Sequence, residues 1–302
     1  MKIGISTEAP GPWSSGDFLK RSAQAVERAG FASMWFGDHV LLFGSYESQY
    51  PYAGVASWGA EEGEAPIPDP RTPFVDPLMA MTWTAAATTT LELGTSIMIL
   101  PQRNPVVLAK EIACLDEMSQ GRITLGVGVG WCKEEAEAIG VDWANRGKLT
   151  DEYIDVLRTL WEQDAAEFSG RTISFRDAYL YPHPFGGRQL PIMIGGDTDI
   201  ALRRVARAGD GWMCFSVPRA EMAARVATLK DLTRQQGRDP EALRISKAIF
   251  TWTKLDELEE MREAGVTEFL LFKCGELSLD DAELNEQVGE AADYFVGGTK
   301  GW

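Results

Sequence analysis

The sequence contains few histidines and no paired cysteines. Its 302 residues include only two histidines, His39 and His183, and its four cysteines are far apart, with no Cys-x-x-Cys pair. This excludes a disulfide framework and offers no spacing typical of a zinc site. Barrel metallohydrolases need several histidine and carboxylate ligands, so we predict no metal site. No Gly-x-Ser-x-Gly motif and no cysteine–histidine signature point to a covalent nucleophile.

Positive charge and long apolar runs are also scarce. Lys and Arg total 29 against 45 Asp and Glu, which gives a net charge of −16. Such a surface repels phosphate backbones and anionic lipids, so we expect neither nucleic-acid nor membrane partners. No apolar run reaches the length of a membrane span, and the first residues lack the apolar core of a signal peptide. With cysteine usage that fits a reducing compartment, these features predict a cytoplasmic protein.

The rest of the chain shows a regular alternation of buried strands and amphipathic helices. The predicted strands are residues 2–6, 33–37, 91–100, 122–129, 191–194, 211–215, 244–250 and 268–273. The predicted helices are residues 17–30, 76–89, 106–118, 150–163, 200–208, 219–236, 254–264 and 280–295. Eight such units predict a (β/α)8 TIM barrel, with a doubly wound open sheet as the alternative. No boundary divides the chain, so we expect one domain over residues 1–302.

Two segments interrupt this alternation and predict insertions after strand two and before strand five. Residues 40–73 carry Tyr46, Tyr50, Tyr52 and Trp58 among small and polar residues. They form either a solvated insertion or a lid or substrate wall, since loops of this length are usually functional or mobile. Residues 168–185 alternate aromatic and polar side chains, which predicts a β-hairpin.

Groups capable of chemistry fall after four different predicted strands, where a barrel carries its active site. They are Asp38-His39, Ser96-Ile97, Gly128-Val129-Gly130-Trp131 and Gly195-Gly196-Asp197. The imidazole of His39 titrates near neutrality, so it is suited to exchange a proton or stabilise charge, although it is also able to cap a strand end. Asp38 either orients His39, binds a ligand ring or satisfies backbone donors.

The glycines at these strand ends have two interpretations each. Gly126-x-Gly128-x-Gly130 is not a dinucleotide fingerprint and allows either a ligand or a neighbouring strand to approach the backbone. Gly195-Gly196 precedes a predicted helix and forms either an anion site or an ordinary turn. Because reactive side chains are so few, we predict that a bound organic cofactor supplies the chemistry.

The chain resembles the bacterial luciferase-like superfamily, and within it the branch of oxidoreductases that depend on the deazaflavin coenzyme F420. The similarity covers nearly the whole chain and consists of short motifs in order. They are Gly37-Asp38-His39-Val40, Asp76-Pro77-Leu78, Leu93-Gly94-Thr95-Ser96, Leu100-Pro101-Gln102-Arg103-Asn104-Pro105, Ser119-Gln120-Gly121-Arg122, Leu125-Gly126-Val127-Gly128-Val129-Gly130-Trp131, Ile192-Met193-Ile194-Gly195-Gly196 and Ala208-Gly209-Asp210-Gly211-Trp212.

The resemblance implies a barrel that binds F420, or alternatively FMN, across the strand ends. It places Asp38 and His39 beside the ring as catalytic residues and a non-proline cis peptide at Ser96-Ile97 behind the ring. It assigns Gly195 and Gly196 to the phosphate-bearing tail, and we add Gly128, Gly130 and Trp131 as further residues near the cofactor. The reaction it implies is hydride transfer, in either direction, between F420 and an enone, carbonyl or alcohol.

The match departs from the family at one position. Sugar-phosphate dehydrogenases of this branch carry a catalytic glutamate directly after the last glycine of strand four, where this chain has Trp131. The departure points to a bulkier or more apolar substrate. Two other functions remain open: an FMN-dependent monooxygenase that uses reduced flavin, oxygen and a reductase partner, and a non-catalytic flavin-binding barrel. Family members are commonly dimers, so a homodimer is a further expectation.

Overall fold

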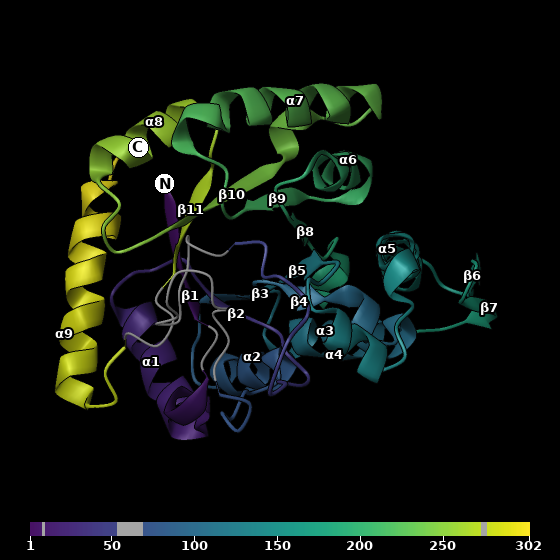
Figure 1. The fold of residues 1–302 in the computed structure, drawn as a ribbon, viewed down its shortest axis with the longest axis horizontal. Coiled ribbons are helices and arrows are strands. Elements are labelled where there is room, and N and C mark those ends of the chain that lie inside the picture. Colours follow the sequence, from purple (N-terminus) through teal and green to yellow (C-terminus); the bar gives the residue numbers. More distant parts are fainter. Residues whose placement is uncertain (8–9, 53–68, 273–276) are drawn as a thin grey trace.

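Eight parallel strands close into a barrel surrounded by helices (Figure 1). A computed structural model describes residues 1–7, 10–52, 69–272 and 277–302. Neighbouring strands follow the order β1, β2, β3, β5, β8, β9, β10 and β11, and β11 pairs with β1 to close the ring. The predicted (β/α)8 barrel is therefore confirmed, and the open doubly wound sheet is wrong.

The elements agree with the predicted alternation to within a few residues. The strands in the described residues are β1 Lys2–Thr7, β2 Ser33–Phe36, β3 Glu92–Thr95, β4 Met98–Ile99, β5 Ile123–Gly128, β6 Ala166–Ser169, β7 Ser174–Ala178, β8 Ile192–Gly195, β9 Gly211–Cys214, β10 Arg244–Ile249 and β11 Glu268–Phe272. The helices there are α1 Gly16–Arg28, α2 Pro77–Ala85, α3 Pro105–Met118, α4 Lys133–Ala138, α5 Arg146–Glu162, α6 Asp199–Ala208, α7 Met222–Gln235, α8 Leu255–Glu263 and α9 Asp281–Ala291, which continues as a π-helix over Ala292–Gly297.

The barrel strands are buried along almost their whole length. Every residue of β5, β9 and β11 is buried, as expected for parallel strands covered by helices outside and by packed side chains inside. The continuous apolar runs in the sequence arise from this two-sided burial.

The third predicted strand is not continuous. The structure divides residues 91–100 into β3 and β4, which are separated by a cis peptide bond between Ser96 and Ile97. Both pieces pair with β5, so they occupy one position in the barrel wall. The apolar pattern continues across the break because both sides of it are buried, and this is why the sequence alone predicts one strand.

Both predicted insertions are present. The hairpin is formed by β6 and β7, which pair antiparallel, lie beside α5 and project from the barrel (Figure 1). The predicted hairpin over residues 168–185 runs too far, because Phe185 belongs to a short 3-10 turn. The other insertion follows β2, and Trp58 within it lies outside the described residues.

A charged network closes the N-terminal end of the barrel. Arg244, the first residue of β10, pairs across the lumen with Glu92 of β3 and with Glu268 of β11, each at 2.7 Å. Its guanidinium also lies 6.0 Å from the ring of Trp35. Because these side chains fill one end, access to the lumen is from the C-terminal strand ends. None of the helices in the described part of the chain is both long and apolar enough to cross a membrane.

Candidate active site

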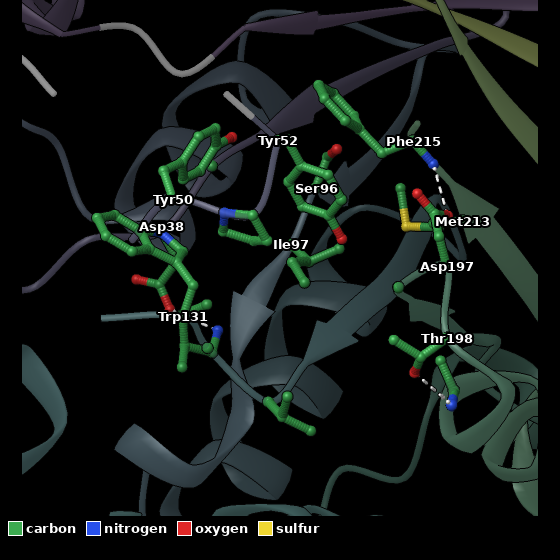
Figure 2. A pocket seen from close by; sticks show the side chains of 18 of the residues that line it. Asp38, Tyr50, Tyr52, Ser96, Ile97, Trp131, Asp197, Thr198, Met213 and Phe215 are labelled. Carbon is green, nitrogen blue, oxygen red and sulfur yellow. Dashed lines mark hydrogen bonds between the residues drawn. The ribbon is translucent and has the colours of Figure 1, made fainter. Parts of the chain in front are cut away.

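A cavity of about 940 Å³ lies at the C-terminal ends of the strands. Its walls come from the segments after β2, β3, β5, β8 and β9 and from inward-facing residues of β10 and β11. Figure 2 shows Ser96 and Ile97 between Trp131 and Tyr50 on one side and Met213 and Phe215 on the other. The four predicted strand ends therefore do converge on one cavity, although Gly128 is not among the residues that line it.

His39 lies at the mouth of this cavity, three residues beyond the end of β2. Its Nδ1 atom is 3.1 Å from Oε2 of Glu135, a carboxylate with a side chain about 1% exposed. The imidazole meets the ring of Phe74 edge to face at 5.4 Å and that of Trp131 at 6.1 Å. These contacts hold the imidazole between an acid and two apolar rings.

Glu135 belongs to α4, a short helix that the sequence analysis does not predict. Its Oε1 atom accepts hydrogen bonds from the backbone amides of Val40 and Leu41, at 2.5 and 3.1 Å. Burial alone raises the pKa of Glu135, but hydrogen bonds from His39 and these amides outweigh burial and hold that pKa below its ordinary value. Glu135 is therefore an anion in spite of its burial.

The preceding residue, Glu134, holds the same insertion at a second point. Its carboxylate accepts from the backbone amides of Glu47 and Ser48, at 2.5 and 2.9 Å. The amide of Lys133 in turn donates to the Ser48 hydroxyl. Burial opposes ionisation here too, but hydrogen bonds from Ser48 and from backbone amides lower the pKa of Glu134 to about 2. The start of α4 thus fixes both ends of residues 39–48.

Asp38 faces away from His39, and its side chain is fully buried. Its carboxylate pairs with Arg103 at 2.5 Å and accepts from the amide of Ile99 at 3.0 Å. Arg103 also pairs with Asp76 at the start of α2. Burial lowers the pKa of Arg103, but the two carboxylates raise it above its ordinary value. Of the predicted roles of Asp38, the structure shows the satisfaction of a backbone donor, and it places Glu135, not Asp38, against the imidazole.

The Ile97 side chain leaves little room for a Cβ atom at two of the predicted glycines. A Cβ atom added at Gly128 would lie 1.9 Å from Cδ1 of Ile97, and one added at Gly195 would lie 3.0 Å from it. At Gly126 an added Cβ would lie 1.9 Å from the Thr95 carbonyl oxygen. Gly126 and Gly128 therefore allow a neighbouring strand to approach, which was one of the two interpretations of this motif.

A glycine in the left-handed backbone conformation precedes Trp131 and turns its side chain toward the cavity. Gly130 has φ of 79°, a conformation that favours glycine. The Trp131 ring then contacts Tyr50 at 5.1 Å and Tyr46 at 5.9 Å, in addition to His39. This places Trp131 in an aromatic wall beside the imidazole.

The insertion after β2 also reaches the opposite side of the cavity. Tyr52 contacts Phe215, which follows β9, at 4.9 Å, and Phe215 contacts Phe272 of β11 at 4.9 Å. Burial raises the pKa of Tyr52, so its phenol stays protonated. Because Tyr50 touches Trp131 and Tyr52 touches Phe215, the segment crosses the mouth. Of the two interpretations of residues 40–73, the described part supports a wall.

The turn after β8 leads into α6. Gly196 has φ of 119°, and its carbonyl accepts from the indole of Trp212 at 2.8 Å. The carboxylate of Asp197 binds the amides of Phe215 and Ser216. Gly195 and Gly196 both line the cavity, in the turn that precedes α6.

An arginine that pairs with no acid in the described part of the chain lies at the α5 end of the cavity. The Arg146 guanidinium stacks 3.6 Å from the ring centre of Trp143 and donates to its carbonyl oxygen. Burial lowers the pKa of Arg146, and the described residues provide neither a carboxylate within ion-pair distance nor a partner for its buried Nε. The nearby Arg204, by contrast, pairs with Asp151 at 2.7 Å. Arg146 is the cation in this wall that is suited to an anionic ligand.

The remaining reactive side chains offer little chemistry of their own. Burial raises the pKa of Cys132 and of Cys214 to about 12 each, so both thiols stay protonated. Among the described residues there is no group of three His, Cys, Asp or Glu side chains able to hold a metal ion. His183 contacts the Trp161 carbonyl near the hairpin, and it does not line the cavity.

The sequence analysis missed Glu135, Arg146 and Arg103. The first two lie in segments without a strong period: residues 133–138 read Lys-Glu-Glu-Ala-Glu-Ala and carry no apolar stripe, and Arg146 is the first residue of a helix predicted to begin at 150. Arg103 lies in the motif Leu100-Pro101-Gln102-Arg103-Asn104-Pro105, but its partnership with Asp38 spans 65 residues and has no sequence signal.

Comparisons with known proteins show the family. A model of the family described as luciferase-like monooxygenase matches residues 2–293. An uncharacterized protein of Mycobacterium tuberculosis (strain H37Rv) is 30% identical over 264 residues, which cover 86% of this chain and 88% of that protein.

Two further similar proteins are named for the coenzyme. An F420-dependent glucose-6-phosphate dehydrogenase of Amycolatopsis mediterranei is 29% identical over 223 residues, 72% of this chain and 58% of that protein. A solved F420-dependent secondary alcohol dehydrogenase, in complex with an F420–acetone adduct, superimposes with a TM-score of 0.76 over 99% of both chains. At 18% identity this second likeness shows the fold alone.

Proposed function

The chain belongs to the luciferase-like monooxygenase family, whose members are oxidoreductases and monooxygenases, and we propose that it is an F420-dependent oxidoreductase. The proposed reaction is transfer of a hydride, in either direction, between F420 and an enone, carbonyl or alcohol. One observation carries the proposal. One large cavity joins an imidazole and aromatic walls at one end to Arg146 at the other, and Arg146 has no carboxylate partner among the described residues.

The cavity's lining fits a flat ring with an anionic tail. Ser96 and Ile97 provide a platform for the ring. Ser246, about 1% exposed, lines the same cavity, and its hydroxyl has no hydrogen-bond partner in the described part of the chain. Arg146 and the turn at Gly195 and Gly196 would hold the charged tail. A buried hydroxyl with no partner and a half-buried cation with no carboxylate partner, in the part of the chain that the structure describes, are costly unless a ligand satisfies them.

The chain's own groups would position the reaction. Bound F420 supplies or accepts the hydride. His39 exchanges the balancing proton with the substrate, because imidazole is the titratable side chain at this mouth suited to neutral pH. Trp131, Tyr50 and Tyr52 exclude water from the reacting centre, since their rings cross the mouth in contact with one another and with Phe215.

The aromatic wall supports a substrate other than a sugar phosphate. Trp131 packs against Tyr50 and His39 at the position where sugar-phosphate dehydrogenases of the branch carry their glutamate. Glu135 on α4 is an acid close to this position. Its carboxylate is already bound by His39 and by two backbone amides. We therefore propose an uncharged enone, carbonyl or alcohol with an apolar body.

An FMN-dependent monooxygenase is the second candidate, because the matching family model carries that description. Such an enzyme would use the same ring platform with reduced FMN and oxygen and would need a reductase partner. It differs from the first candidate in requiring oxygen and in consuming FMN rather than F420.

A turnover assay separates these functions. The wild-type protein is incubated anaerobically with oxidised F420 and a panel of secondary alcohols, and with reduced F420 and a panel of enones and ketones. The proposal predicts substrate-dependent change of the F420 absorbance without oxygen. Turnover only with reduced FMN and oxygen would favour the monooxygenase, and no turnover with saturable binding would leave a flavin-binding barrel.

We also propose a homodimer. Met79 and Trp83 on α2 and Val107 on α3 are 60%, 57% and 54% exposed, and these two helices are neighbours on the barrel (Figure 1). Large exposed apolar side chains on adjacent helices are typical of an interaction surface. Light scattering after gel filtration distinguishes a dimer from the 33.3 kDa monomer, which would contradict the proposal.

A further inference from the structure

We infer that Glu135 is the positioning residue for His39, and that it fixes the imidazole with Nδ1 as the hydrogen-bond donor. The catalytic meaning of this inference rests on the proposed function, but the hydrogen-bond geometry does not. No sequence motif predicts the pairing, because 96 residues separate the two side chains.

Two of the three contacts hold the Glu135 carboxylate independently of His39. Oε1 accepts from the backbone amides of Val40 and Leu41, while Oε2 faces Nδ1 of His39. The backbone amide of Glu135 donates to Sγ of Cys132. The acceptor is therefore fixed by the backbone, and the imidazole turns to meet it. This arrangement gives a ring with a fixed orientation at the cavity mouth.

The chemistry of an ionised carboxylate then determines the tautomer. Two backbone N–H groups donate to Oε1 of Glu135, which favours the ionised carboxylate, and an ionised carboxylate accepts hydrogen bonds and has no proton to donate. Nδ1 of His39 must therefore carry a proton. The proton that moves during a reaction is the one at Nε2, as in other sites where a carboxylate orients a histidine.

Glu135 is an acid that contacts this ring directly. Asp38, beside His39 in the chain, is paired with Arg103 and buried. The other neighbours with defined contacts, Phe74 and Trp131, are uncharged rings. Glu135 thus supplies the negative charge that stabilises a protonated His39.

Glu135→Gln is the test variant, and Glu134→Gln is its matched control. Gln retains an oxygen that accepts from Val40 and Leu41 but presents an NH₂ group to Nδ1. Because the NH₂ group donates where the carboxylate accepted, Nδ1 becomes the acceptor, and the tautomer with the proton on Nε2 is favoured. Glu134→Gln makes the same chemical change one residue earlier, where the partners are Glu47 and Ser48 rather than His39.

Nitrogen NMR of histidine-labelled protein measures the tautomer directly and needs no cofactor. The chain has two histidines, so His183→Gln leaves a single imidazole to assign. In the wild type we expect a protonated Nδ1, in either the neutral ring or the imidazolium. In Glu135→Gln the neutral ring should carry its proton on Nε2, and Glu134→Gln should match the wild type. A wild-type ring with an unprotonated Nδ1 overturns the inference without any variant.

Kinetics provide the second readout. We expect Glu135→Gln to lower kcat about 10- to 100-fold with little change in the KM for F420, since general acid–base catalysis commonly contributes at least this much. Glu134→Gln should leave the Nδ1 proton in place, so any fall in kcat that it causes through Glu47 and Ser48 should come without a change of tautomer. Unchanged kcat and an unchanged tautomer in Glu135→Gln would refute the positioning role. A tautomer change in a protein that fails to turn over F420 would refute the proposed function instead.

Discussion

Substitution of Gly128 by alanine tests how the ring platform is built. The added Cβ would lie 1.9 Å from Cδ1 of Ile97, while the next atom of that side chain is 3.1 Å away. Relief requires the Ile97 side chain to turn, and it borders the cavity. Overpacking of this kind costs roughly 1–3 kcal/mol of unfolding free energy. We also expect weaker F420 binding, because the displaced side chain would occupy the ring site.

We expect Ile97→Val to relieve the short contact that Gly128→Ala creates. Valine lacks the Cδ1 atom responsible for the short contact, and the loss of one methyl group from a partly buried isoleucine costs about 0.5–1.5 kcal/mol. The double variant Gly128→Ala/Ile97→Val should therefore lose less unfolding free energy than the two single variants lose in sum, by about 1 kcal/mol or more. Urea unfolding of the four proteins measures this coupling.

Gly126→Ala is the matched control. Its added Cβ would lie 1.9 Å from the Thr95 carbonyl oxygen, which is backbone and has no rotamer to change. Ile97→Val should leave its destabilisation unchanged. If Gly128→Ala and Ile97→Val were additive to within about 0.5 kcal/mol, the platform would not depend on this packing and the reasoning would be wrong.

Two further substitutions test the charged groups. Asp38→Asn should destabilise the protein by roughly 1.5–3 kcal/mol in chemical unfolding, because it removes one charged hydrogen bond of Arg103 while the pair with Asp76 remains. A loss below about 0.5 kcal/mol would contradict the ion pair. The lowered pKa of Glu134, about 2 against an ordinary 4.5, stabilises the fold above pH 4.5, and this contribution is lost as the pH falls toward 2. Glu134→Gln should therefore flatten the stability profile in that window, and an unchanged acid slope would show that its bonds to Glu47 and Ser48 do not form.

The sequence predicts the barrel and the place of its active site well, because both follow from short-range patterns. Parallel strands buried on both faces leave apolar runs, and turns follow them at their C-terminal ends. Asp38-His39 and Gly195-Gly196 could be located for this reason. The division of strand three could not, because Ser96 and Ile97 interrupt the hydrogen bonding without interrupting the apolar pattern.

Partnerships between distant residues are the part that sequence patterns do not contain. Asp38 follows the same strand as His39, yet its carboxylate turns to Arg103, while the imidazole meets an acid from a helix six residues long. The sequence does not single out Arg146, because its importance depends on having no carboxylate partner among the described residues, and this is visible only in the structure. Such features depend on which side chains the closed barrel brings together, and only the structure shows them.

Equilibrium binding of F420 tests the central claim that this cavity holds the deazaflavin. Titration of the wild-type protein, followed by the coenzyme's absorbance, should saturate with a dissociation constant in the micromolar range or below. Arg146→Gln should weaken binding about 10- to 100-fold, the equivalent of one charge-assisted hydrogen bond. Arg207→Gln, which changes an exposed arginine paired with Asp155 outside the cavity, should bind as the wild type does. Saturable binding of FMN without any binding of F420, or equal affinity in Arg146→Gln, would contradict the account.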